Sequence, residues 1–167
     1  MVKKTTHQRR VKETAKQVGQ FILDTAIITV PLYLLFSATT ILHQIAAHLS
    51  QFLLSFLGKT AIIASQNGAF HLIMPSLDAE ISNLCSGGLE LALLIGFIAA
   101  SRDKTIEQRI KGIVVGLLFF ILFNASRIAF TINSFGTPWF EPLHEALFRA
   151  VLIIGLVTYY AIWYYFE

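Results

Sequence analysis

Apolar residues are concentrated in four stretches of this chain, and polar residues separate these stretches. The stretches cover residues 21–57, 89–100, 113–132 and 146–166. A helix that spans a membrane needs about 20 consecutive apolar residues. The pattern therefore predicts an all-α integral membrane protein. The second stretch is short, and it spans a bilayer only if the polar turn before it dips into the membrane.

The first stretch is longer than one span requires, and two interpretations of it are open. It is either a single transmembrane helix with an amphipathic extension or a hairpin of two helices. The second half of the stretch carries a polar stripe formed by His43, Gln44, His48 and Gln51. Such a stripe is typical of a helix that lies on the membrane surface.

The basic residues favour the first interpretation. Residues 1–20 carry six Lys and Arg side chains, and residues 101–112 carry four. Cytoplasmic flanks of membrane helices are enriched in these residues, so both segments are expected inside the cell. Residues 21–57 then cross the membrane once. We predict four transmembrane helices with both termini cytoplasmic, divided into a basic segment 1–20, a first helix with its extension 21–57, and a core 58–167.

A small β-hairpin is predicted between the first two membrane helices, on the outer face. Two apolar runs, residues 60–65 and 69–74, flank Asn67-Gly68. An Asn-Gly pair between such runs is a strong signal for a tight hairpin turn. Pro75 is expected to end the second strand, because proline cannot donate a main-chain hydrogen bond.

The composition agrees with the membrane class: 55% of the residues are hydrophobic and 14% are charged, with a formal net charge of +3. Cys85 is the only cysteine, so the chain cannot form an internal disulfide. His43 and His48 are five residues apart and do not share a helix face. They are expected at the surface, like His71, rather than on a metal ion. No cofactor, metal or nucleic-acid partner is predicted.

Three polar residues fall in one layer near the outer face of the predicted bundle. Cys85 lies at the outer end of the second helix. Arg127 lies fourteen residues after Ile113, about 21 Å along a helix that starts at the inner face. The hydrocarbon core is about 30 Å thick, so Arg127 reaches its outer third. His144 lies just before the fourth helix, which starts outside.

These three residue types suit nucleophilic attack on a carbonyl group. A thiolate attacks, a histidine moves the thiol proton to the leaving amine, and an arginine stabilises the oxyanion. Each residue also has an ordinary interpretation: Cys85 as packing, Arg127 as an ion-pair partner of Glu90, and His144 as a solvated side chain. Arg127 is the hardest to explain in that way, because a charge inside a membrane helix is costly.

The same residues resemble the exosortase/archaeosortase family of integral-membrane transpeptidases. The resemblance covers about residues 58–166, as in short, core-only members. It is carried by Cys85-Ser86-Gly87, Asn124-Ala125-Ser126-Arg127-Ile128 and His144, together with the hairpin that precedes Cys85. It implies Cys85 as nucleophile, Arg127 as partner of the substrate or transition state, and His144 as acid and base. The residues expected to bind substrate or support the site are Asn124, Ser86, Gly87 and Glu90.

Members of this family process secreted proteins that end in a short motif, a membrane helix and a basic tail. The resemblance therefore implies a multi-pass enzyme of the cell membrane with its active site on the outer side. It would cleave such signals through a thioester on Cys85 and transfer the protein to an acceptor at the cell surface, with a lipid amine as a candidate. Membrane lipids are the other expected partners. A non-catalytic membrane adaptor and a haem- or quinone-binding helical bundle remain as alternatives.

Overall fold

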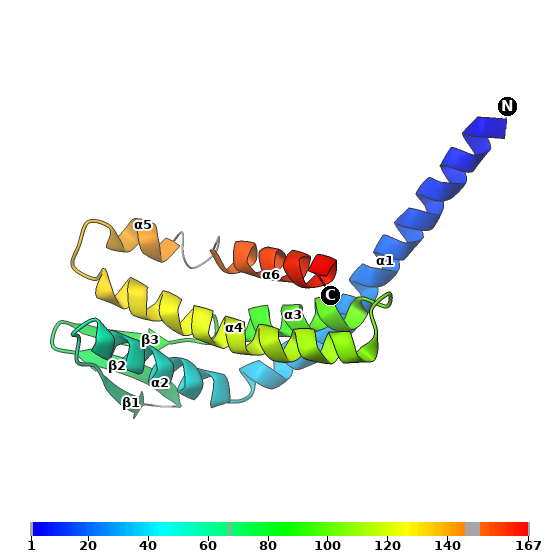
Figure 1. Ribbon diagram of the computed structural model, residues 1–167. Coiled ribbons are helices and arrows are strands. Elements are labelled where there is room, and N and C mark those ends of the chain that lie inside the picture. Colours follow the sequence, from blue (N-terminus) through cyan, green and yellow to red (C-terminus); the bar gives the residue numbers. More distant parts are fainter. Residues whose placement is uncertain (1, 67, 146–150, 167) are drawn as a thin grey trace.

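The chain folds into a mostly helical molecule with a small antiparallel sheet at one end (Figure 1). The computed structural model describes residues 2–66, 68–145 and 151–166. In chain order the elements are α1 (Val2–Ser37), α2 (Ile41–Phe56), β1 (Ile62–Gln66), β2 (Ala69–Met74), β3 (Leu77–Ile81), α3 (Gly88–Ala100), α4 (Ile106–Asn133), α5 (Phe140–Glu145) and α6 (Leu152–Phe166). Asn67 of the predicted turn and residues 146–150 of the fourth apolar stretch lie outside the described residues.

Two helices occupy the first apolar stretch. α1 ends at Ser37, and α2 begins at Ile41 after a short break. Among the described residues, α1 from Val11 onward and α4 are long and apolar enough to cross a membrane. α3 and α6 are apolar but shorter, with 13 and 15 residues. At 1.5 Å per residue the described parts of these two helices are about 20 and 22 Å long, less than the thickness of the hydrocarbon core.

α4 begins at Ile106, seven residues before the predicted start of the third stretch. The Thr105 hydroxyl accepts a hydrogen bond from the Gln108 main chain, and the Gln108 side chain accepts one from the Thr105 N–H. This capping box satisfies main-chain donors that would otherwise have no partner at the helix start. Arg109 is therefore part of the helix and not of a loop, and its guanidinium donates to the Ala99 and Lys104 carbonyls across the turn.

The predicted hairpin is confirmed, but the sheet has a further strand. β1 pairs antiparallel with β2, with Gln66 opposite Ala69. The second strand ends at Met74, directly before Pro75, as predicted, and Pro75 and Ser76 form a two-residue turn into β3. β3 pairs antiparallel with β2 and lies at the edge of the sheet. Proline is compatible with this turn, where its main-chain nitrogen is not needed as a donor.

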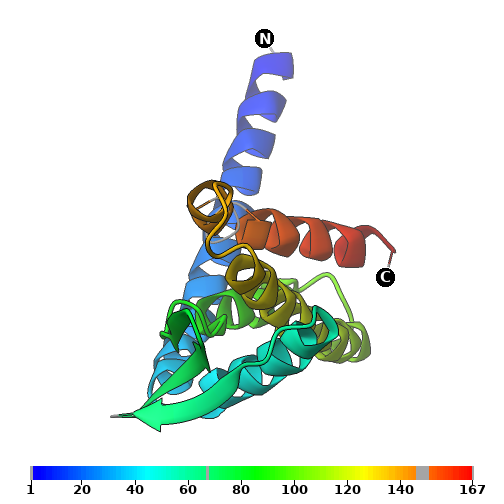
Figure 2. The same cartoon turned by 90° about the vertical axis from the view of Figure 1, so that its left-hand side faces the viewer.

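α2 packs between the sheet and α4, and α4 lies between α2 and α5 (Figures 1 and 2). Ser50 and Leu54 of α2 are fully buried, and the Ser50 hydroxyl donates to the Ala125 carbonyl of α4. His43 is also buried in α2, only 8% exposed, so the expectation of a surface position is wrong for this residue. The polar stripe of the sequence therefore includes a residue that faces the interior of the fold.

α1 and α3 lie in close contact because small side chains separate them. A Cβ atom added at Gly96 of α3 would overlap the Thr29 hydroxyl of α1. The Thr29 hydroxyl donates to the Ala92 carbonyl, 3.3 Å away. Close approach of this kind is typical of helices that associate in a membrane. Asp24 of α1 forms an ion pair with Arg102 in the turn after α3, at 2.7 Å.

Candidate active site

A tight loop, residues 82–87, carries the single cysteine from β3 to α3. The main-chain N–H groups of Cys85 and Ser86 both donate to the Ser82 carbonyl. The Ser86 hydroxyl donates to the Asn83 carbonyl at 2.8 Å. Gly87 caps α3 with a φ of +79°, a left-handed conformation that favours glycine. These contacts fix the position of Cys85 at the N-terminus of α3, where the thiol is half-buried.

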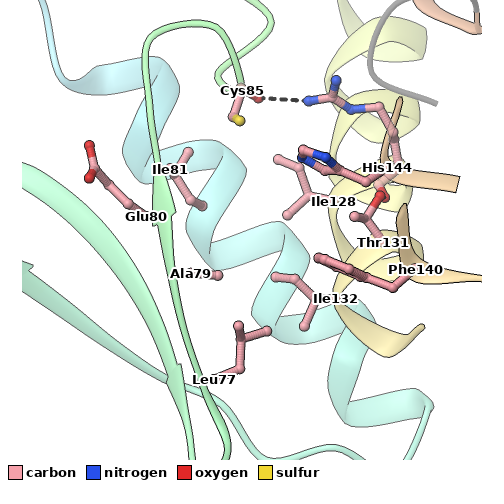
Figure 3. A pocket seen from close by; sticks show the side chains of 11 residues that line it. Leu77, Ala79, Glu80, Ile81, Cys85, Ile128, Thr131, Ile132, Phe140 and His144 are labelled. Atoms are coloured by element: carbon pink, nitrogen blue, oxygen red, sulfur yellow. Dashed lines mark hydrogen bonds between the residues drawn. The ribbon is translucent and has the colours of Figure 1, made fainter. Parts of the chain in front are cut away.

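Two side chains of α4 hold this loop by the Cys85 carbonyl. Asn124 Nδ2 donates to it at 2.9 Å, and Arg127 Nη2 donates to it at 3.2 Å. The bond from Arg127 is the dashed line in Figure 3. Both side chains are buried, and they are three residues apart, so they share one face of the helix. The guanidinium also interacts with the Cys85 side chain. One helix face thus positions the main chain of the candidate nucleophile.

The Cys85 thiol opens into a cavity of about 250 Å³ between β3, α4 and α5. The lining residues are Leu77, Ala79, Glu80, Ile81, Cys85, Arg127, Ile128, Thr131, Ile132, Phe140 and His144. Figure 3 shows the Cys85 side chain and the His144 imidazole pointing into this space from opposite sides. The His144 ring is exposed and stacks on Phe140, with 5.8 Å between ring centroids and 14° between ring planes.

The cavity brings together Cys85, Arg127 and His144, which are far apart in the sequence. His144 belongs to the short helix α5, which was not predicted from the sequence. The described part of α6 begins only at Leu152. A thiol, an imidazole and a guanidinium around one cavity can supply a nucleophile, a proton carrier and an oxyanion partner.

None of the four expected supporting residues lines the cavity. Two of them, Ser86 and Gly87, are buried within the loop, and Asn124 is buried on the face of α4 that contacts the loop. A Cβ atom added at Gly87 would come within 3.1 Å of Asn124 Nδ2, so these two residues fit closely. Glu90 lies in the first turn of α3 and interacts electrostatically with Arg127. Its buried Oε2 accepts no hydrogen bond from the described residues.

The wall formed by β3 was not predicted from the sequence. Its signal is the alternation of apolar and acidic residues in Leu77-Asp78-Ala79-Glu80-Ile81, which is typical of a half-buried strand. Within the described part of the chain, no three His, Cys, Asp or Glu side chains gather as ligands for a metal ion.

Comparison with known proteins gives a consistent result. The transmembrane exosortase family matches residues 12–157 of this chain. A curated relative, the probable archaeosortase D of Methanocaldococcus jannaschii, is 31% identical over 77 residues, which are 46% of this chain and 50% of the relative. The matched region thus spans about half the length of that relative. No solved structure matches the chain.

Proposed function

The chain belongs to the transmembrane exosortase family, and we propose that it is a membrane cysteine transpeptidase or endopeptidase for C-terminal sorting signals. Its proposed substrates are secreted proteins that end in a short motif, a membrane helix and a basic tail. The observation that carries the proposal is the single cavity lined by Cys85, Arg127 and His144. These residues come from a loop and two helices, and a purely structural cluster would not need an open cavity between them.

The reaction follows from the chemistry of the three side chains. The Cys85 sulfur attacks the carbonyl carbon of the scissile peptide bond, and His144 accepts the thiol proton. The C–N bond then breaks, His144 returns the proton to the departing amine, and a thioester remains on Cys85. An amine or water attacks this thioester and releases the Cys85 thiol. With an amine as acceptor, the secreted protein becomes attached at the cell surface, and with water it is released.

Arg127 has two roles in this proposal. Its Nη2 group holds the Cys85 carbonyl, so the residue positions the nucleophile before substrate binds. The remaining donors of the guanidinium stabilise the negative oxygen that forms when sulfur attacks the carbonyl. Arginine suits both roles because it stays charged and offers several donors in a fixed plane. Asn124 supports the first role only, since it bonds the same carbonyl from one turn away.

The experiment that tests the proposal is replacement of Cys85 by Ala in cells that carry a secreted reporter fused to a motif, membrane helix and basic tail. We expect the reporter to remain uncleaved while the variant is still found in the membrane fraction. Cys85→Ser serves as a second variant of nearly the same size. Normal cleavage with both variants would refute the enzyme and leave the membrane adaptor as the better account.

We further propose four membrane spans, both termini in the cytoplasm and an active site that faces outward. Support comes from the basic residues of segments 1–20 and 101–112, which are both expected on the inner side, and from the arrangement in Figure 1. There both termini and the α3–α4 turn lie at one end of the molecule, and the sheet lies at the other. Because Cys85 is the only thiol, a membrane-impermeant maleimide should label it in intact cells. Labelling that requires opened cells would contradict the orientation.

A further inference from the structure

β3 is an edge strand whose second side is unpaired within the described residues. The sheet order is β1-β2-β3, so β3 pairs with β2 alone. Among the described residues, no main-chain hydrogen bond from a turn or loop involves residues 77–81. An unpaired edge exposes a row of N–H and C=O groups that can bind another extended chain.

The register shows which groups of β3 point away from β2. Met74 and Leu77 flank a two-residue turn, and such a turn is closed by a hydrogen-bonded pair. Hydrogen-bonded and non-hydrogen-bonded pairs alternate along an antiparallel ladder. Ala79 and Ile81 therefore direct their main-chain groups toward β2. Asp78 and Glu80 direct theirs toward the free edge.

The free edge of β3 borders the cavity that holds Cys85. Ala79, Glu80 and Ile81 all line this cavity, although side chains of successive strand residues point to opposite faces. Figure 3 shows the Glu80 side chain pointing away from Ile128 and Ile132 on the opposite wall. Glu80 therefore lines the cavity with its main chain. Its N–H and C=O groups, which face the free edge, are the polar groups that a ligand in this part of the cavity would meet.

We propose that the substrate binds by strand addition: the residues that precede the scissile bond pair with the free edge of β3, and the scissile carbonyl reaches Cys85. This proposal rests on the proposed function and specifies how its substrate is recognised. The edge leads directly to the nucleophile, because only residues 82–84 separate β3 from Cys85. An extended peptide also satisfies main-chain groups that are costly to leave unpaired beside apolar side chains.

The position of the sheet determines which part of the substrate lies on β3. The sheet projects beyond α3 toward the end of the molecule opposite both termini (Figure 1). The substrate's own membrane helix follows its motif and must lie in the bilayer, so the motif and the secreted domain before it extend toward the sheet. Leu77, Ala79 and Ile81 form an apolar row on the inner face of β3, and alternate side chains of the motif would contact this row.

The main-chain hydrogen bond is tested by replacing Glu80 with Pro, which removes the edge N–H without removing a bond to β2. The matched control is Ser65→Pro on β1. The main-chain groups of residues 62, 64 and 66 of β1 point toward β2, because they pair with the β2 residues whose main-chain groups point away from β3. The N–H of Ser65 therefore points away from β2, toward the free edge of β1. This edge is on the side of the sheet remote from Cys85. Both variants place a proline at an edge position of the same sheet, where proline is tolerated.

We expect Glu80→Pro to slow reporter cleavage about fivefold to tenfold more than Ser65→Pro does, the effect of one lost hydrogen bond. Glu80→Ala keeps the N–H and should cleave several times faster than Glu80→Pro. Equal cleavage by the two proline variants would overturn strand addition.

Disulfide cross-linking tests the same pairing without catalysis. Asp78→Cys is introduced together with Cys85→Ala, and single cysteines are placed at successive positions of the reporter before the cleavage site. Strand pairing predicts cross-links at alternate reporter positions, because only these side chains share the face of residue 78. Cross-links without alternation, or none, would overturn the inference. The proposed function fails by a different result: cleavage of the reporter by the variant that carries only Cys85→Ala.

Discussion

Replacing Gly87 by Ala tests whether the fit between the Cys85 loop and Asn124 positions the nucleophile. Gly87 has a φ of +79°, and residues with a side chain adopt this conformation at a cost of about 1–2 kcal/mol. The added Cβ would also lie 3.1 Å from Asn124 Nδ2 and 3.2 Å from Asn124 Cγ. These contacts are too close to keep unchanged, so the side chain that holds the Cys85 carbonyl must move.

The two effects add to a substantial loss of the active loop conformation. Weakening the bond from Asn124 to the Cys85 carbonyl costs about 1 kcal/mol. Together with the backbone cost the total is about 2–3 kcal/mol, which corresponds to about 30-fold to 150-fold less of the competent conformation. We expect reporter cleavage to fall by a similar factor, and the rate of Cys85 alkylation by a maleimide to change as well.

Gly58→Ala is the matched control for this variant. Gly58 has a φ of +71°, but nothing lies within 4 Å of a Cβ added there. The control therefore carries a similar backbone cost without the contact to Asn124, and it should cleave the reporter at close to the normal rate. Normal cleavage by Gly87→Ala would refute the reasoning. If Gly58→Ala lowers reporter cleavage as much as Gly87→Ala does, the contact with Asn124 is unimportant.

Two other changes separate the site from the surrounding helices. Asn124→Ala should lower reporter cleavage about tenfold, because it removes one buried hydrogen bond. Ser126→Ala, on the exposed face of α4, should leave cleavage unchanged. Equal rates in the two variants would contradict the positioning role of Asn124. Gly112→Ala should lower the melting temperature in detergent, because the added Cβ would overlap the Trp163 indole of α6. Gly19→Ala should leave the melting temperature unchanged, because nothing lies within 4 Å of a Cβ added there. An unchanged melting temperature for Gly112→Ala would contradict the packing of α4 against α6.

The sequence located the candidate site better than it located the elements around it. Charge bias and helix rise predicted that Cys85, Arg127 and His144 lie in one layer, and the structure places all three at one cavity. This was possible because a bilayer restricts a chain to helices of a certain length and orientation. The family resemblance is confirmed by the match over residues 12–157.

The errors of the sequence analysis have physical explanations. The third apolar stretch was predicted to begin at residue 113, but the Thr105 and Gln108 capping box starts α4 seven residues earlier, among charged residues. β3 was missed because only a two-stranded hairpin was predicted before Cys85, although the proline that ends β2 also fits a turn between two strands. His43 was expected at the surface because it is polar, but α2 is covered on one face by α4 and the sheet.

The hydrogen bonds to the Cys85 carbonyl could not be predicted from the sequence. Arg127 was expected to be a partner of the substrate or transition state, and Asn124 to bind substrate or support the site. Both donate to the main chain of the nucleophile loop. Such a contact depends on how the helix α4 is rotated about its axis, and that rotation is set by packing against α2 and α3. The pattern of residues fixes the depth of a side chain in the bilayer but not the partner of each donor.

The most direct test of Cys85 as the nucleophile is mass spectrometry of the protein after brief exposure to the reporter. The account predicts an adduct on the peptide that contains Cys85, with the mass of the reporter segment that ends at the cleavage site. Hydroxylamine should release this adduct, as expected for a thioester. Cleavage of the reporter with no adduct on Cys85 at any time, and at an undiminished rate in Cys85→Ala, would contradict the account.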